Sequence, residues 1–233
     1  LVQKSYSPNF PGEFGGGVIN LTTSAVPKES FLTLSAGGGF HSETTGIQSY
    51  SFRGGKYDWT GFDTGSRNNP AALDNFFSSG RQLATLTRAE NRAIGGSLVN
   101  YRNGLVQRLS ITQPNSSFSI SGGTSWDVGG DMVLGLIATA GYSNRWQNRD
   151  SVQQRAPAAD LSQPDADFDR VNTDNRIVVN GLVGLGLEFG DNKIRWTNLY
   201  IRDTLKHTRL ALAQRPTQND SDYMQQDTAW FER

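Results

Sequence analysis

The sequence predicts an all-β fold built from long antiparallel strands, and three observations support this prediction. Apolar and polar residues alternate over stretches that exceed the roughly 9–11 residues needed to cross a bilayer as a strand. Short glycine-rich turns alternate with long connections. The sequence contains no apolar run long enough for a transmembrane helix. Together these features are typical of a transmembrane β-barrel.

The alternation is clearest in three stretches. Between 117 and 127, Phe118 and Ile120 share the apolar parity, and small polar residues take the other. The stretches 132–146 and 171–189 repeat the pattern. Strict alternation over such lengths requires two unlike environments on the two faces of a sheet. Aromatic residues near strand ends on the apolar parity are expected to form an interfacial girdle: Trp126, Tyr142 and Trp146.

The pattern predicts seven strands, joined by short and long connections in turn. The strands are expected at about 30–41, 46–53, 56–62, 115–127, 131–146, 170–189 and 193–208. Tight turns are expected near Gly54-Gly55-Lys56, Gly129-Gly130-Asp131 and Gly190-Asp191-Asn192, and long connections over 63–114, over 147–168 and after about Leu210. Outer-membrane barrels have short periplasmic turns and long external loops. We therefore expect the three glycine-rich turns on the periplasmic side and the long connections outside.

Two local patterns qualify this strand pattern. In the stretch 193–208, large apolar residues occur on both parities, so a bulge or a register change is expected there.

The long connection 63–114 carries helix signals. Asn69 followed by Pro70 predicts one helix start, with Asn69 as the N-cap. Thr87 and Glu90 form a capping-box pattern that predicts a second helix, ending near Ile94.

A glycine run near the beginning of the chain leads directly into an alternating strand. The run is Gly15, Gly16 and Gly17, and the strand continues through Val18, Ile19, Asn20 and Leu21. Glycine supplies the backbone freedom for such an abrupt strand start. This segment resembles the end of the plug domain in TonB-dependent outer-membrane receptors, where the barrel follows at once. Asp63-Thr64-Gly65-Ser66-Arg67 also resembles an Asp-Asp-Gly-Ser-Arg element of some of these receptors, and it is otherwise read as a turn with an internal ion pair.

The resemblance implies a fold, an activity and a location. Residues 1–27 would form the C-terminal end of a plug domain, and residues 28–233 the first part of a β-barrel, an open fragment of a 22-stranded barrel. Such receptors lie in the bacterial outer membrane, in contact with its lipid. They import a scarce small-molecule nutrient, such as a siderophore–iron chelate, a vitamin or a glycan. The TonB–ExbB–ExbD complex supplies the energy through an upstream part that this sequence does not contain.

The composition excludes several other activities. The 22 basic and 22 acidic residues balance, so we expect no nucleic-acid partner. There is no cysteine, and the two histidines are far apart in sequence, so no metal site is expected. No nucleophile, phosphate-loop or dinucleotide motif occurs, and we expect neither enzyme activity nor a cofactor. The charged residues on the polar parity are the candidates for facing a barrel lumen: Arg53, Arg145, Arg176 and Glu188.

Two other functions remain open at this point. A passive porin-like barrel would share the long strands, but the glycine-to-strand motif argues against it. A soluble β-sandwich, such as a carbohydrate-binding module, would place the apolar parity against a second sheet. Long strands and aromatic residues near strand ends argue against that reading. Solubility without detergent would separate a sandwich from a barrel.

Overall fold

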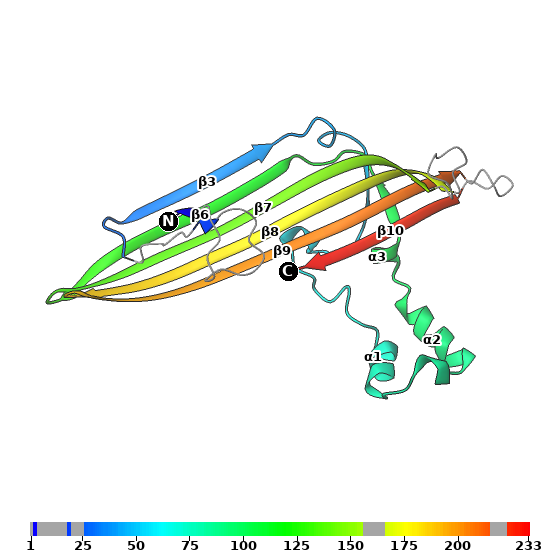
Figure 1. Ribbon diagram of the computed structural model, residues 1–233, viewed down its shortest axis with the longest axis horizontal. Coiled ribbons are helices and arrows are strands. Elements are labelled where there is room, and N and C mark those ends of the chain that lie inside the picture. Colours follow the sequence, from blue (N-terminus) through cyan, green and yellow to red (C-terminus); the bar gives the residue numbers. More distant parts are fainter. Residues whose placement is uncertain (1, 4–17, 20–25, 156–165, 215–222) are drawn as a thin grey trace. The chain divides into compact units, whose positions relative to one another are not determined.

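The fold is dominated by one six-stranded sheet, seen in a computed structural model that describes residues 2–3, 18–19, 26–155, 166–214 and 223–233. Its strand order is β10-β9-β8-β7-β6-β3, and the pairing is antiparallel (Figure 1). The strands are β3 (Phe31–Gly39), β6 (Asn115–Gly129), β7 (Met132–Arg155), β8 (Ala166–Phe189), β9 (Asn192–Gln214) and β10 (Tyr223–Glu232). The predicted all-β antiparallel architecture is therefore confirmed. The described residues show an open sheet and no closed barrel.

Two of the predicted tight turns join neighbouring strands of this sheet. Gly129 and Gly130 link β6 to β7 with φ values of 111° and 64°. Gly190, with φ 53°, lies in the turn between β8 and β9. A positive φ strains residues that carry a Cβ, so glycine at these positions allows the chain to reverse within two or three residues.

Two early strand predictions are wrong for the large sheet. Strand β4 (Ser49–Phe52) does form, but it pairs with β5 (Val106–Leu109) in a separate two-stranded sheet. The stretch 56–62 is no strand, because it holds the 3-10 helix η1 (Asp58–Thr60). Gly61 follows with φ 82°, and the Asp58 carboxylate accepts a hydrogen bond from the Gly55 amide. This local turn competes successfully with the extended conformation that the alternation of 57–61 suggests.

Strand lengths in the second half of the chain exceed the prediction. The external connection predicted over 147–168 is mostly strand, because β7 continues to Arg155 and β8 begins at Ala166. The segment after Leu210, also predicted to be external, contains the end of β9 and all of β10. Residues 147–155 are almost all polar, so their sequence is typical of a loop, although backbone pairing extends β7 through them. From Thr204 to Ala213, β9 pairs with β10 in unbroken register.

The connection between β3 and β6 holds the helices. They are α1 (Ala71–Ser78), η2 (Leu83–Thr85), α2 (Arg88–Leu98) and α3 (Tyr101–Gly104). The capping box at Thr87 and Glu90 is confirmed in both directions, and α2 runs four residues beyond the predicted end at Ile94. Helix α1 starts one residue later than predicted, because Pro70 itself is the N-cap.

The plug-like motif is described only in part. Val18–Ile19 form β2, which pairs antiparallel with β1 (Val2–Gln3). The rest of the motif, Gly15, Gly16, Gly17, Asn20 and Leu21, lies outside the described residues. The predicted division of the chain at residue 27 therefore stays a prediction.

The contacts divide the chain into two units. The first contains Leu1–Thr33, Ser121–Thr139 and Leu182–Leu199, and the second contains Leu34–Ile120, Ala140–Gly181 and Tyr200–Arg233. In the first unit many large apolar side chains of the strands are exposed: Leu32, Trp126, Val128, Leu134, Val183, Leu185, Ile194 and Trp196. The buried apolar side chains of the described residues are few, Phe52, Ile177, Ala211 and Ala213, and all lie in the second unit.

Close backbone approach explains one glycine inside a strand. A Cβ on Gly123 would lie 2.7 Å from the Phe31 ring and 3.2 Å from the carbonyl oxygen of Leu136. Those neighbours belong to β3 and β7, which flank β6 in the sheet. Gly123 therefore makes room for packing in the first unit, as expected for a strand glycine.

Candidate functional site

In the second unit, β8 and β9 present two different faces. One face is buried beneath residues 44–67, which we call the insertion. The Thr173 hydroxyl accepts a hydrogen bond from the Tyr50 amide at 3.3 Å, and the Thr204 hydroxyl donates to the Gly61 carbonyl at 2.7 Å. Thr173 is 2% and Thr204 0% exposed. The polar residues on this face therefore bind the backbone of the insertion.

Four charged residues hold the insertion to the sheet, and we call them the docking cluster: Asp58, Asp63, Arg67 and Lys206. The Arg67 guanidinium donates to both oxygens of Asp58 at 3.0 and 2.7 Å, and it contacts Asp63 at 2.8 Å. Lys206 of β9 places its Nζ 3.3 Å from Asp58 Oδ2. Each of the four side chains is between 10% and 15% exposed.

Aromatic rings complete the docking cluster. The Arg67 guanidinium carbon lies 3.9 Å from the centre of the Trp230 ring of β10. The Lys206 Nζ lies 4.5 Å from the centre of the Phe52 ring of β4. Cation–π contacts of desolvated groups contribute about 2 kcal/mol. The cluster thus links the insertion to β9 and β10 through charge and ring contacts together.

The segment 63–67 is a turn closed by an internal ion pair, as its sequence suggested. The Asp63 carboxylate accepts hydrogen bonds from the Gly65 amide, the Ser66 hydroxyl and the Arg67 amide. Burial raises the pKa of Asp63, but the hydrogen bonds from Ser66 and Arg67 outweigh it and leave this pKa below its usual value. The carboxylate therefore stays ionised and orients the arginine toward Asp58.

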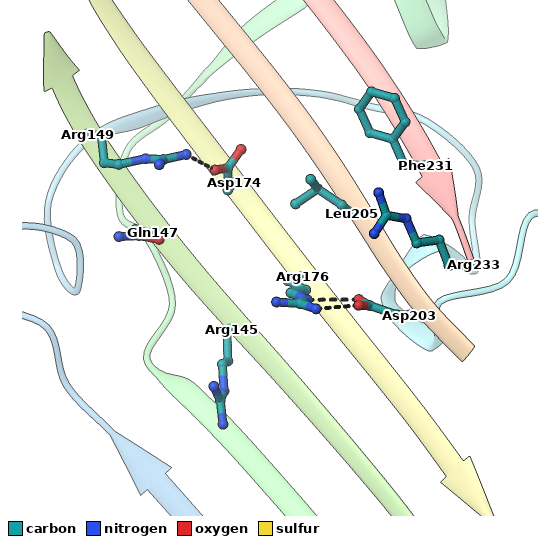
Figure 2. Close-up of a pocket in the computed structure, with 9 residues that line it drawn as sticks. All are labelled: Arg145, Gln147, Arg149, Asp174, Arg176, Asp203, Leu205, Phe231 and Arg233. Carbon is teal, nitrogen blue, oxygen red and sulfur yellow. Dashed lines mark hydrogen bonds and ion pairs between the residues drawn. The ribbon is translucent and has the colours of Figure 1, made fainter. Parts of the chain in front are cut away.

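The opposite face of the same strands carries a polar groove of about 580 Å³, which we call the arginine groove (Figure 2). Residues of β7, β8, β9 and β10 and the residue after β10 line it: Arg145, Gln147, Arg149, Asp174, Arg176, Asp203, Leu205, Phe231 and Arg233. Four arginines face two aspartates, which leaves two more guanidinium groups than carboxylates. The volume lies within the range of small-molecule sites, about 300–1,000 Å³.

Ion pairs cross this groove from strand to strand. Arg149 of β7 pairs with Asp174 of β8, and Asp174 also contacts His207 of β9, with 2.5 Å between Oδ1 and Nδ1. Arg176 of β8 pairs with Asp203 of β9, with its Nε 2.8 Å from Oδ1 (Figure 2). Arg149 and Arg176 are more than half exposed, so each pair contributes only about 0–1 kcal/mol to stability. The pairs mainly fix the orientation of the guanidinium groups.

Two arginines of the groove form no ion pair with a described carboxylate. The side chains of Arg145 and Arg233 make no ion pair or hydrogen bond with any residue that the structure describes. Arg233 is held in place by its backbone, whose amide and carbonyl pair with those of Asp203 at 2.9 and 3.0 Å. Figure 2 shows Arg145 on β7 without a carboxylate beside it. The groove is therefore locally cationic in a chain of zero net charge.

The structure brings together two of the four residues predicted to face a lumen. Arg145 and Arg176 both line the arginine groove. Arg53 follows β4 and lies outside the six-stranded sheet, where its carbonyl accepts a hydrogen bond from Lys206 Nζ at 3.4 Å. Glu188 lies in the first unit and pairs with Lys193 at 2.9 Å across the turn between β8 and β9. The lumen itself stays a prediction for all four.

The three aromatic residues predicted as a girdle have different surroundings. Trp126 of β6 is 47% exposed in the first unit. In the second unit, Tyr142 and Trp146 of β7 are half-buried. The Tyr142 hydroxyl donates to the carbonyl of Trp59 in the insertion at 2.6 Å. Trp126 therefore has the exposure that an interfacial residue needs, whereas Tyr142 also anchors the insertion.

Sequence reasoning missed Arg149, Asp174, Asp203 and Arg233 as groove residues. Asp174 lies on the polar parity of β8 with Arg176, so the alternation carried a signal for it. Arg149 continues the parity of Arg145 and Gln147, but the strand was predicted to end at 146. Asp203 lies between Ile201 and Leu205, where mixed parity gave no signal.

The described residues contain no group of histidine and carboxylate side chains that could hold a metal ion. None of the helices in that part of the chain is long and apolar enough to span a membrane. Comparison with known proteins gives no match: no family model, no curated protein and no solved structure resembles this chain significantly.

Proposed function

We propose that this chain belongs to an outer-membrane receptor that imports a scarce nutrient and is driven by the TonB–ExbB–ExbD complex. Residues 1–27 would be the end of its plug and residues 28–233 the first strands of its barrel. The observation that carries the proposal is the exposed apolar surface of a long-stranded antiparallel sheet. In the first unit, Trp126, Leu185 and Trp196 are 47%, 41% and 52% exposed.

Lipid is the environment that suits such a surface. A soluble sheet normally buries one face against a second layer. In the second unit the insertion, which contains β4, covers one face of β8 and β9 in this way. Strands of 15–24 residues, as in β6, β7, β8 and β9, also exceed the roughly 9–11 residues that span a bilayer.

The glycine-to-strand motif distinguishes a gated receptor from a passive barrel. Its residues Gly15–Leu21 come shortly before β3, the first strand of the large sheet, as they do before the barrel in the receptors that they resemble. In this proposal the edge strands β3 and β10 pair with further strands of the complete barrel. An exposed strand edge would otherwise invite aggregation.

The experiment that tests this proposal is fractionation of the native host cells with an antibody against residues 66–104. The expected result is an outer-membrane band several times heavier than 25.5 kDa that becomes more abundant under nutrient starvation. A band of about 25.5 kDa in the soluble fraction, stable without detergent, would refute the proposal. It would favour the β-sandwich instead. An outer-membrane band of that small mass would favour a porin-like barrel.

A further inference from the structure

We propose that the arginine groove binds the anionic group of a small ligand, a carboxylate or a phosphate. This inference deepens the proposed function, because the ligand would be the imported nutrient or a part of it. It rests on the second unit alone, since every lining residue belongs to that unit.

The charge balance of the groove favours an anion. Asp174 and Asp203 each accept an ion pair from one arginine, Arg149 and Arg176 respectively. The guanidinium groups of Arg145 and Arg233 make no ion pair with a described carboxylate, although Arg233 is near enough to Asp203 to interact with it electrostatically. The four arginines therefore still exceed the two aspartates by two charges. Like charges that are gathered without counterions repel one another, and a bound anion would relieve that repulsion.

The geometry of the side chains favours a planar or tetrahedral oxyanion. A guanidinium group presents a rigid fork of donors that matches carboxylate and phosphate oxygens. The ion pairs with Asp174 and Asp203 hold Arg149 and Arg176 in fixed orientations, so part of the site is ordered before the ligand arrives. Gln147 adds an amide donor, and Leu205 and Phe231 add apolar surface for the body of the ligand (Figure 2).

Stability gives no competing explanation for Arg145. Its side chain is exposed and makes no hydrogen bond or ion pair with a described residue that substitution would remove. Arg145→Gln should therefore fold normally, which makes it a clean test. Arg108→Gln in β5 is the matched control, because Arg108 is also an exposed arginine that makes no ion pair with a described residue, and it lies outside the groove.

The test is calorimetric titration of the purified full-length protein with malonate and, separately, with inorganic phosphate. We expect wild type and Arg108→Gln to bind at least one probe, and Arg145→Gln and Arg233→Gln to bind it about tenfold more weakly, as for the loss of one charged hydrogen bond. Arg145→Lys keeps the positive charge but loses the forked guanidinium donors, so its affinity should lie between those of wild type and Arg145→Gln.

Two results would overturn the inference. One is equal affinity of wild type and Arg145→Gln for both probes. The other is no binding of either probe to wild type at millimolar concentration, which would result if an acidic segment of the same protein already fills the groove. These outcomes are separate from those of the fractionation experiment. A soluble protein with an intact anion site would refute the receptor and keep the site, and an outer-membrane protein without anion binding would do the reverse.

Discussion

Replacing Asp58 by alanine tests whether the docking cluster holds the insertion on the sheet. The substitution removes two hydrogen bonds from Arg67, one from the Gly55 amide and the 3.3 Å contact with Lys206. Arg67 keeps Asp63 at 2.8 Å, whereas Lys206, with a side chain only 10% exposed, loses its carboxylate. Breaking a buried ion pair from one side costs about 3–5 kcal/mol. Because Arg67 stays paired, we expect about 3 kcal/mol.

The assay is native-state hydrogen exchange of the full-length protein, with residues 49–67 compared with β6. A loss of about 3 kcal/mol should increase the opening constant of the insertion about 100-fold, because each 1.4 kcal/mol is a factor of ten. The pairing within β6, β7 and β8 does not involve the cluster, so exchange in β6 should not change. Asp74→Ala is the matched control, since the Asp74 carboxylate in α1 makes no ion pair with any described residue.

A second variant distinguishes two sources of the lost stability: the missing contacts of Asp58, and the buried charge of Lys206 that is left without a carboxylate. If much of the cost comes from the uncompensated ammonium group of Lys206, then Lys206→Met in the Asp58→Ala background should restore part of the protection. Exchange of 49–67 that is the same in Asp58→Ala as in wild type would refute the reasoning. So would a double variant that opens more readily than Asp58→Ala alone.

Three further predictions concern local structure. Thr87→Ala should destabilise the start of α2 by about 1 kcal/mol, because it removes the acceptor for the Glu90 amide, and faster amide exchange in the first turn would show this. Hydrogen bonds from Arg81 and Thr87 lower the pKa of Glu90 from 4.5 to about 2. Stabilisation by this carboxylate should therefore be complete above pH 4.5 and disappear as the pH falls toward 2. The Glu90 carboxyl chemical shift measures the titration midpoint, and a midpoint near 4.5 would show that the hydrogen bonds are absent. Gly61→Ala should weaken the docking of the insertion by about 1–2 kcal/mol, because φ is 82° and the new Cβ would lie 3.2 Å from Ile177; unchanged exchange of the insertion would contradict this.

The sequence predicted the parts of the fold that depend on one local rule. Alternation located β6, β7 and β8, and glycine located the turns at Gly129–Gly130 and Gly190, because a turn this tight needs positive φ. The capping box at Thr87 was predictable for the same reason, since its two hydrogen bonds connect residues three apart.

The rest could not be predicted, because distant residues decide it. Asp58 pairs with Arg67 and with Lys206, which is far along the chain, and no local pattern identifies Lys206 as its partner. The polar end of β7 is a strand because neighbouring backbones pair with it, and its composition gives no sign of that. Strand β10, which is mixed in composition, is a strand through its pairing with β9. Only part of the arginine groove could be predicted from the sequence. Arg145 and Arg176 share the polar parity, but Asp203 becomes a partner of Arg176 only through the pairing of β8 with β9.

The two wrong early strands do not change which side of the membrane each connection is proposed to lie on, because two crossings in opposite directions are removed together. Removing 46–53 and 56–62 from the barrel count takes away an even number of crossings. In the proposed barrel, the connection from β3 to β6 is therefore still expected on the side opposite to the turn at Gly129–Gly130. The arginine groove belongs to the second unit, which also contains that long connection and its helices. If the receptor proposal holds, the groove lies toward the external loops that first meet the ligand. An accessibility probe attached at Asn69 should then label intact cells, and a probe at Asp131 should not; the reverse pattern would place the groove on the periplasmic side.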